Sequence, residues 1–267
     1  MNIIFAGDRQ IAVRVLNFVV ERGFRPAALC LSAGDRASHA EELRTTCDWL
    51  PPERVFRGGS LRSHEAEQVF RRADPDLFIS VHFPYLVPDS LLRLPRRGCV
   101  NLHPALLPYN RGWHTPSWAI LDGTPYGATL HMMESEVDAG DIVYQEEIEI
   151  LPEDTAHTLY TRVQDLEFDV FCKAWPLLLE NPIPATPQDL EKGTVHDRTA
   201  LVKSGLQVIS LDREWDPNQL LDRLRALTTN RLSEAAFFTL NGCRYRVQLS
   251  VTRETPAPVL SGKAEAS

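Results

Sequence analysis

The chain of 267 residues has no excess of basic residues, since 28 Lys and Arg stand against 36 Asp and Glu and give a formal net charge of -8. Proteins that bind nucleic acid need a basic face to neutralise phosphates, so no nucleic-acid partner is expected. No apolar run approaches the roughly 20 residues that span a bilayer. The apolar residues 1–6 carry no basic leader and are not typical of a signal peptide. We expect a cytoplasmic protein with no membrane partner.

Cysteine pairs and glycine-rich loops are also missing. The cysteines are scattered and form no Cys-x-x-Cys motif, so we expect reduced thiols and no metal site. Gly7 follows an apolar run, but Asp8, Arg9 and Ile11 occupy the turn where a dinucleotide fingerprint would have further glycines. Without these glycines the backbone cannot approach a pyrophosphate closely, which argues against NAD binding.

The first two-thirds of the chain alternate between apolar runs and segments with helical periodicity. Alternation of this kind predicts an α/β fold with a Rossmann-like, mostly parallel sheet and right-handed crossovers. The pattern then predicts two longer strands added at one edge of the sheet and a long amphipathic helix. The expected strands are 2–6, 27–31, 76–81, 99–102, 128–133 and 142–150, and the expected helices are 11–19, 60–72 and 155–179.

Three prolines within residues 182–187 mark the best boundary between two units. We place a catalytic domain at residues 1–187 and a small α+β appendage at residues 188–254. The appendage should contain a helix at residues 217–227 and a β-hairpin that turns at Asn241-Gly242. Residues 255–267 are rich in Pro, Ala and Ser, and we expect a disordered tail there.

Candidate chemistry lies just after the fourth expected strand. Open parallel sheets place their sites at the carboxyl ends of strands, where Asn101 and His103 alternate and so point to the same side. Asp138 follows in a turn between the two added strands, with Gly140 expected to relax the backbone. Each residue alone has a structural explanation as a cap, a turn residue or a hydrogen-bonded histidine. Together they supply an amide donor, an imidazole and a carboxylate, which can move a one-carbon acyl group onto an amine.

The pattern Asn-x-His-Pro-x-x-Leu-Pro at residues 101–108, followed by Asp-x-Gly-Asp-Ile at residues 138–142, resembles the N10-formyltetrahydrofolate-dependent formyltransferase family. The resemblance is strong over residues 70–180. It implies the formyltransferase fold, N10-formyltetrahydrofolate as co-substrate and Asn101, His103 and Asp138 as the catalytic set. Asp141 would be the second, less critical aspartate.

These roles agree with the chemistry of the side chains. His103 can take or relay the proton of the attacking amine. Asp138 would orient His103, stabilise its protonated form, or accept the proton through water. Asn101 offers a neutral N–H donor to the oxyanion, and one such donor is commonly worth about 2.7–4 kcal/mol.

Residues 81–87 match the family's folate loop in position. The resemblance implies that the backbone there and near Val137 reads the edge of the pterin, and a buried loop under a helix is the alternative explanation. The expected co-substrate residues are Phe83, Tyr85, Leu86, Val87 and Val137.

Residues 108–131 and the appendage are similar to sugar N-formyltransferases, which implies a nucleotide-linked amino deoxysugar as acceptor and a homodimer. Arginines could meet a pyrophosphate and an aromatic ring could stack on a base. Salt bridges and simple packing are the alternative explanations. Residues 195–198 depart from the Tyr-His-x-x-Lys-Asp segment of those enzymes and keep only the histidine. The candidate acceptor residues are Asn110, Arg111, Trp113, Arg223, Arg225 and Tyr245.

Other functions remain open. The acceptor could be another small amine, such as a purine precursor or a secondary metabolite. Water could attack the folate instead, which would make the protein a formyltetrahydrofolate hydrolase. A non-catalytic binding protein would have no physical need for the complete set of three side chains. Methionyl-tRNA is disfavoured as acceptor because the appendage is small and the chain is acidic.

Overall fold

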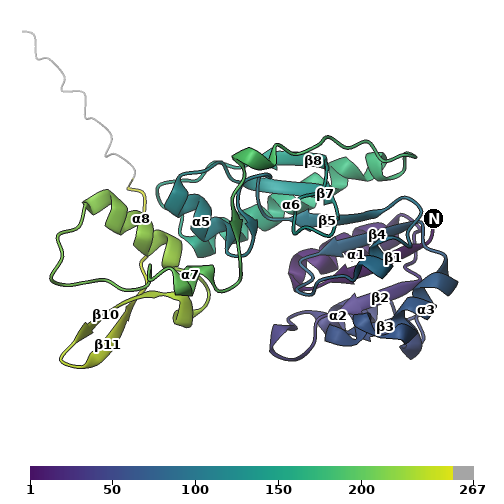
Figure 1. The fold of residues 1–267 in the computed structure, drawn as a ribbon, viewed down its shortest axis with the longest axis horizontal. Helices are drawn as coiled ribbons and strands as arrows, with labels where there is room; N and C mark the ends of the chain where they lie inside the picture. The colour runs from purple at the N-terminus through teal and green to yellow at the C-terminus, as the bar shows by residue number, and fades with distance from the viewer. Residues whose placement is uncertain (255–267) are drawn as a thin grey trace, which may run out of the picture.

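A computed structural model describes residues 1–254, apart from the side chain of Arg36, and the tail predicted at residues 255–267 lies outside the described residues. A seven-stranded sheet forms the centre of the molecule, in the order β3-β2-β1-β4-β5-β7-β8 (Figure 1). Strands β1 to β5 pair in parallel, and β7 and β8 are added at one edge, as the sequence predicts. These two added strands are antiparallel. The strands are β1 (Ile3–Gly7), β2 (Ala28–Leu31), β3 (Val55–Arg57), β4 (Leu77–Val81), β5 (Cys99–His103), β7 (Gly127–Met132) and β8 (Ile142–Glu147).

Helices cover both faces of this sheet because its inner strands are apolar on both sides. Along β1, Ile3 and Phe5 belong to one buried cluster, and Ile4 and Ala6 belong to another. The first cluster includes side chains of α1 (Arg9–Glu21), α2 (Ala40–Thr46) and α6 (Ala156–Leu178). The second includes α3 (His64–Ala73) and α4 (Asp89–Leu92). Short 3-10 helices at Gly34–Arg36, Pro52–Arg54, Gly58–Arg62, Leu190–Lys192 and Leu232–Glu234 complete the described helical segments.

Helix α6 is fixed at both ends. At its start, Thr155 Oγ1 accepts a hydrogen bond from the backbone N–H of Thr158, and Thr158 Oγ1 accepts one from that of Thr155, which makes a capping box. Towards its end, Phe171 and Trp175 pack against Phe18 of α1 with ring centroids 5.8 Å apart in each case. Helix α6 also packs against β7 and β8 of the sheet.

Residues beyond the proline-rich segment return to the catalytic domain before they enter the appendage. Thr186 exchanges backbone hydrogen bonds of 2.8 Å with Ile142, so the segment runs along the edge of β8. Strand β9 (Val195–His196) then pairs with β6 (Arg111–Gly112). Residues 188–196 therefore contact the domain from which the sequence separates them, and the boundary at residue 187 stays a prediction.

The appendage contains the predicted helix and hairpin (Figure 1). Asn241 and Gly242 have φ values of 50° and 77°, as a two-residue hairpin turn requires. The helix packs against α5 (Thr115–Asp122) of the catalytic domain. The elements of the appendage are α7 (Ala200–Lys203), α8 (Pro217–Leu227), β10 (Ala236–Leu240) and β11 (Cys243–Val247).

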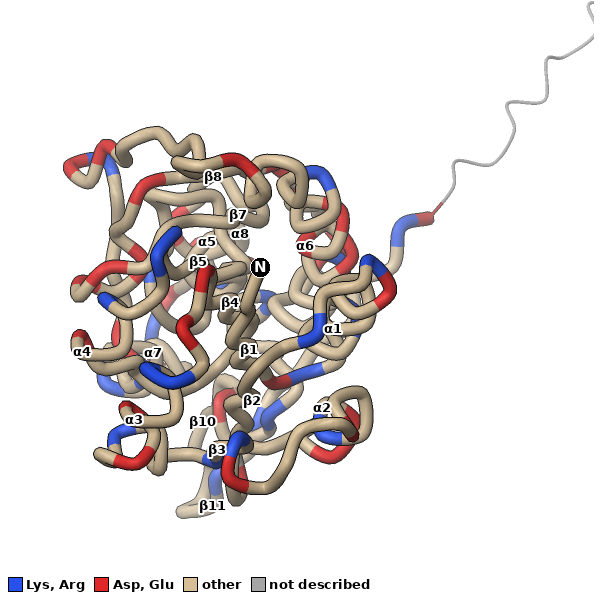
Figure 2. Tube along the Cα trace, turned by 90° about the vertical axis from the view of Figure 1, so that its right-hand side faces the viewer, with Lys and Arg blue, Asp and Glu red and all other residues tan. Residues whose placement is uncertain are grey.

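Lys and Arg residues are interspersed with Asp and Glu residues along the chain in the view of Figure 2. No helix within residues 1–254 has the length and apolar character needed to cross a membrane.

The end of α6 offers a matched test of the core. Leu178 is fully buried, whereas its neighbour Leu179 is 45% exposed. Leu178→Ala should lower the free energy of unfolding by about 2–5 kcal/mol because it leaves a cavity. Leu179→Ala should change it by no more than about 0.5 kcal/mol. Urea unfolding of both variants checks this, and equal losses would contradict the packing of α6.

Candidate active site

The three residues singled out in the sequence meet at the carboxyl end of β5. His103 Nδ1 lies 3.6 Å from Asp138 Oδ2, and Asn101 Nδ2 lies 3.5 Å from Asp138 Oδ1. His103 is buried, with 6% of its surface exposed, and the Asp138 side chain is nearly as enclosed. Asn101 is half-buried. The structure therefore gathers an amide, an imidazole and a carboxylate into one enclosed site.

The turn between β7 and β8 sets the position of Asp138. Asp138 itself has φ 51°, a left-handed conformation in which aspartate is tolerated better than most residues. Gly140, which the sequence suggested would relax the backbone, does not have a positive φ. Its lack of a side chain is needed because a Cβ would collide with the carbonyl oxygen of Met132. Gln188 Nε2 completes the turn by donating to the carbonyl oxygens of Asp138 and Gly140 at 3.0 and 2.5 Å.

The Asp138 carboxylate also receives a backbone donor. The N–H of Gly112 in β6 donates to Asp138 Oδ2 at 2.9 Å. Gly112 has φ 94°, and a Cβ there would collide with the backbone oxygen of His196 in β9. Glycine is therefore required at residue 112 both for its conformation and for the close pairing of β6 with β9.

His131 is a fourth polar residue of the site, which the sequence analysis missed. It lies on β7 opposite Asn101, with its Nε2 3.2 Å from Asn101 Nδ2 and 3.5 Å from Asp138 Oδ1. Its Nδ1 donates to the carbonyl oxygen of Met132 at 2.7 Å. The alternating residue pattern of β7 indicates which face of the strand His131 lies on. Its contact with Asn101 depends on the pairing of β7 with β5.

Burial and charge act in opposite directions on the two titratable groups. Burial lowers the pKa of His103, although the neighbouring carboxylate of Asp138 acts to raise it. Burial tends to raise the pKa of Asp138, but His103, His131 and the N–H of Gly112 outweigh it and hold the pKa of that carboxyl well below its usual range. At neutral pH the site therefore pairs an ionised Asp138 with a neutral His103.

Nε2 of His103 is the reactive atom that this arrangement leaves available. It is buried and has no hydrogen-bond partner among the described residues, whereas Nδ1 faces Asp138. A proton on Nδ1 would be held by the carboxylate, which leaves the lone pair of Nε2 free to accept another proton. The site can thus perform proton transfer beside an N–H donor, without a covalent intermediate.

The predicted folate loop follows β4 and has both buried and exposed side chains. Val87 is buried and Phe83 packs against the cluster below the sheet, whereas Leu86 is 64% exposed. The ring of Tyr85 packs at a tilt against that of Phe83, and its hydroxyl donates to the carbonyl oxygen of Ala33. Across from the loop, Val137 is 42% exposed beside Asp138. Leu86 and Val137 are the two predicted side chains that offer apolar surface to a ligand.

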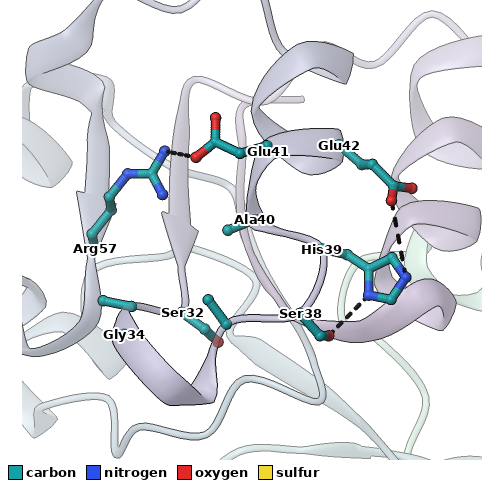
Figure 3. Close-up of a pocket in the computed structure, with 10 residues that line it drawn as sticks. Ser32, Gly34, Ser38, His39, Ala40, Glu41, Glu42 and Arg57 are labelled. Carbon is teal, nitrogen blue, oxygen red and sulfur yellow. Dashed lines mark hydrogen bonds and ion pairs between the residues drawn. The ribbon is translucent and has the colours of Figure 1, made fainter.

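Two hollows have linings that do not include the three predicted catalytic residues. One of about 470 Å³ is lined by Asp89, Leu92 and Arg93 beyond the predicted folate loop and by residues 133–136 just before Val137. The other, of about 320 Å³, lies at the ends of β2 and β3 (Figure 3). There Arg57 is paired with Glu41 at 2.8 Å, and Glu42 is a second carboxylate in the lining. The charge of this lining does not favour the binding of a phosphate.

Two predicted acceptor residues lie beside the three catalytic candidates. The guanidinium of Arg111 is buried, and its Nη1 donates to the exposed carboxylate of Glu136 at 2.8 Å. Its Nε is buried without a partner among the described residues. Trp113 is partly exposed, and Arg198 lies over its ring at 5.4 Å. Arg111 and Trp113 flank Gly112 in the sequence, so the strand pairing that positions Gly112 also positions these two residues.

Asn110 and Arg225 have structural partners instead. Asn110 is fully buried, and its Nδ2 donates to Thr124 at 2.8 Å. Arg225 is buried and donates at 2.7 Å to each of two backbone carbonyls, those of Leu151 and Asp154. Because these side chains are engaged within the fold, we do not include them in the acceptor site. The sequence could not reveal this, since the carbonyls lie more than 70 residues away in the chain.

The remaining candidates lie in the appendage and not beside Asp138. Arg223 faces Trp215, with its guanidinium 4.8 Å from the ring centroid. Tyr245 lies on β11, where it stacks on Phe238 and is about half exposed. Neither side chain contacts the three catalytic candidates within this chain.

Comparisons with known proteins agree with this fold and site. Residues 23–175 match the model of the formyl transferase family, and residues 204–253 match the N-formyltransferase dimerization C-terminal domain. The first match covers more than half of the chain, so the chain belongs to the formyl transferase family.

Individual relatives differ in what their names say of the acceptor. The methionyl-tRNA formyltransferase of Geobacillus thermodenitrificans (strain NG80-2) is 33% identical over 72% of this chain, which spans 62% of that relative's length. The structure of a sugar N-formyltransferase from Shewanella sp FDAARGOS_354 aligns with a TM-score of 0.79 at 23% identity, covering 96% of this chain and 99% of that one. An N-formyltransferase from Helicobacter canadensis, solved with folinic acid and dTDP-3-aminofucose, aligns with a TM-score of 0.65 at 18% identity, covering 91% and 85%. The two structures show a common fold.

The buried carboxylate predicts a pH-dependent contribution to stability. The pKa of Asp138 in the folded state lies below that of an unfolded aspartate, about 3.9. Its contribution is therefore present above that pH and is lost as the pH falls below it. Asp138→Asn should lower the free energy of unfolding by about 1.5–3 kcal/mol at pH 6, and this difference should shrink below about pH 4.

Urea unfolding of both proteins between pH 6 and pH 3 measures this difference, with Asp141→Asn in the same turn as the charge-matched control. A difference between wild type and Asp138→Asn that stays constant over this range would show that the carboxylate is not held in its charged form by its neighbours.

Proposed function

We propose that this protein transfers a formyl group from N10-formyltetrahydrofolate to the amino group of a nucleotide-linked amino deoxysugar. The single observation that supports it most is the meeting of Asn101, His103 and Asp138 in one buried site, in a chain that belongs to the formyl transferase family. The co-substrate would supply an activated formyl carbon. The protein's own residues would bind and orient the reactants and move one proton.

His103 is the proton acceptor in this proposal. The attacking amine must be neutral, and it loses a proton as its nitrogen bonds to the formyl carbon. The bond from that carbon to N10 of the folate would break, and tetrahydrofolate would leave with the proton that His103 relays to N10. Nε2 of His103 is free to take that proton, directly or through one water. The imidazolium that results is stabilised by Asp138, which faces Nδ1 at 3.6 Å. Burial, which lowers the pKa of His103, keeps the ring neutral and ready to accept a proton near pH 7.

Asn101 is the electrostatic donor. Its Nδ2 carries two N–H bonds, and one is directed towards His131 and Asp138. The second can donate to the formyl oxygen as that oxygen gains negative charge during attack. Asp138 and His131 thus fix the amide so that its free N–H is already oriented.

The residues present fit a folate. The pterin and benzoyl rings need an apolar surface, and Leu86 and Val137 expose apolar side chains on the two segments that border the site. The hollow of about 470 Å³ lies next to the same two segments, where the remainder of the molecule could extend. Phe83, Tyr85 and Val87 would hold the loop in place.

The appendage and the positive charge of Arg111 favour a nucleotide-linked sugar as the acceptor. The Helicobacter canadensis neighbour was solved with dTDP-3-aminofucose, and residues 204–253 match the C-terminal domain of N-formyltransferases. Arg111 is the candidate anion contact, because a phosphate could take the place of the exposed Glu136 carboxylate on its buried guanidinium. Trp113, Arg223 and Tyr245 remain candidates for contacts with the nucleotide.

Methionyl-tRNA is the second candidate acceptor, since a relative at 33% identity carries that name. The net charge of -8 and the interspersed charges of Figure 2 argue against a polyanion of that size. Another small amine and hydrolysis of the folate are alternatives that the same assay separates.

We also propose a homodimer. The matched C-terminal model is described as a dimerization domain. Within it, exposed apolar side chains are available to a second copy of the chain, namely Val208, Leu211, Leu221, Leu232, Leu240 and Tyr245.

The acceptor can be identified by the release of tetrahydrofolate from N10-formyltetrahydrofolate. We expect release only with a nucleotide-linked amino sugar, together with a product heavier by one formyl group. The panel should include several amino-sugar nucleotides, methionyl-tRNA and a reaction without amine. Release with methionyl-tRNA alone, or without any amine, would replace the proposed function with the corresponding alternative.

Substitution of the donor and the base should separate chemistry from binding. Asn101→Ala should lower kcat by about 10²–10³-fold, and His103→Ala by about 10²–10⁴-fold. Asn101→Asp should be no better than alanine, because a second anion repels the oxyanion. Folate affinity should change little, as measured by calorimetry. His157→Ala on the exposed start of α6 is the matched control. Wild-type kcat in either site variant would rule out this mechanism.

A further inference from the structure

A second histidine–carboxylate pair is buried beside the first. His82 Nε2 lies 2.7 Å from Glu167 Oε1, and both side chains are almost completely enclosed. His82 directly follows β4, and Glu167 lies in the middle of α6 with no exposed surface. Tyr160, one further residue of α6, places its hydroxyl 3.0 Å from His82 Nδ1. Neither the sequence motifs nor the mechanism above gives this pair a role.

The hydrogen bonds assign the proton positions within this pair. Burial raises the pKa of Tyr160, so its hydroxyl keeps its proton and donates it to His82 Nδ1. With Nδ1 as the acceptor, Nε2 is the atom of His82 that donates to Glu167 Oε1. The other carboxyl oxygen of Glu167, Oε2, is buried without a hydrogen-bond partner among the described residues.

The strand register places His82, the histidine of this pair, next to His103. Val81 of β4 pairs in parallel with Leu102 of β5, so the next residues along the two strands, His82 and His103, lie side by side. His82 also has φ 52°, and both of its ring nitrogens are bound to side chains of α6. A non-glycine residue keeps this conformation only where its surroundings fix it. Helix α6 therefore holds the end of β4 directly beside the proposed base.

We propose that Glu167, held in place by His82, is a positioning residue whose buried negative charge stabilises the imidazolium of His103 that forms when the acceptor amine loses its proton. This inference rests on the proposed function, in which His103 is the proton acceptor. Asp138 faces Nδ1 of His103 from the β7–β8 turn, and Glu167 adds a second anion from α6. A charge in a buried environment acts over a longer distance than one in water, so direct contact is not needed.

The groups around His103 shift its pKa in both directions. Burial lowers its pKa most, the carboxylate of Asp138 raises it, and His131 on β7 lowers it. Glu167 on α6 and a hydrogen bond with the backbone of Asn110 also raise it. Removal of the Glu167 charge should therefore make His103 a weaker base.

The titration of His103 tests this directly. In the full-length protein without ligands, the ring protons of His103 can be followed by NMR and assigned by their loss in His103→Gln. Glu167→Gln keeps the shape of the side chain and can still accept from His82, but it removes the charge. We expect the pKa of His103 to fall by about half a pH unit or more. Asp169→Asn, on the exposed side of the same helix, should change it by no more than about 0.2.

A second variant covers the case in which Glu167→Gln does not fold. The double variant His82→Phe/Glu167→Leu replaces the buried polar pair by apolar side chains, a change that proteins often tolerate better than the loss of one partner. It should show the same fall in the pKa of His103. An unchanged His103 titration in a folded variant would overturn the inference.

The pH profile of kcat/KM supplies a second readout. His103 must be neutral in the free enzyme, so activity rises with pH through its pKa, and Glu167→Gln should move this acidic limb to lower pH by the same amount. A limb that stays in place in an active Glu167→Gln enzyme would overturn the inference. Because the NMR titration needs no substrate, a shifted His103 in a protein that transfers no formyl group would overturn the proposed function and would still establish that the charge of Glu167 raises the pKa of His103.

Discussion

The buried carboxylate of Asp138 is the constraint on which the rest of the site depends. An ion removed from water is unfavourable unless donors replace its hydration. Here the donors are the backbone N–H of Gly112 on β6 and the side chains of Asn101 and His103 on β5. The left-handed turn at Asp138 aims the carboxylate at them. The addition of β7 antiparallel to β5 is thus a requirement of the chemistry as well as of the sheet.

Burial in the same site also determines how strong a base His103 is. An enclosed imidazole is a weak base, which keeps it neutral, but a base that is too weak cannot take a proton from an amine. In the proposed mechanism two anions offset this effect, Asp138 in the turn between β7 and β8 and Glu167 on α6. Tyr160 and His82 hold the second anion at a fixed position. The base therefore combines protection from solvent with electrostatic support.

The sequence predicted the parts of this molecule that local pattern determines. Apolar runs and helical spacing predicted a mostly parallel sheet with two strands added at one edge and predicted α6, and the motifs singled out Asn101, His103 and Asp138. Strand β3 was missed because only residues 55–57 form it, directly after a turn with two prolines. The contact of His131 with Asn101 and the hydrogen bonds of Arg225 to the carbonyls of residues 151 and 154 were missed because these partners are distant in the chain. Such contacts become visible only once the elements pack.

The segment 188–196 links the appendage to the catalytic chemistry. Gln188 holds the turn of Asp138, and β9 pairs with β6, whose Gly112 donates to the same carboxylate. The chain then continues directly into the appendage. A displacement of this segment would remove the Gly112 and Gln188 hydrogen bonds together and leave a buried anion with fewer donors. The same strand pairing carries Arg111 and Trp113, so the proposed acceptor contacts and the carboxylate are positioned by one structural element.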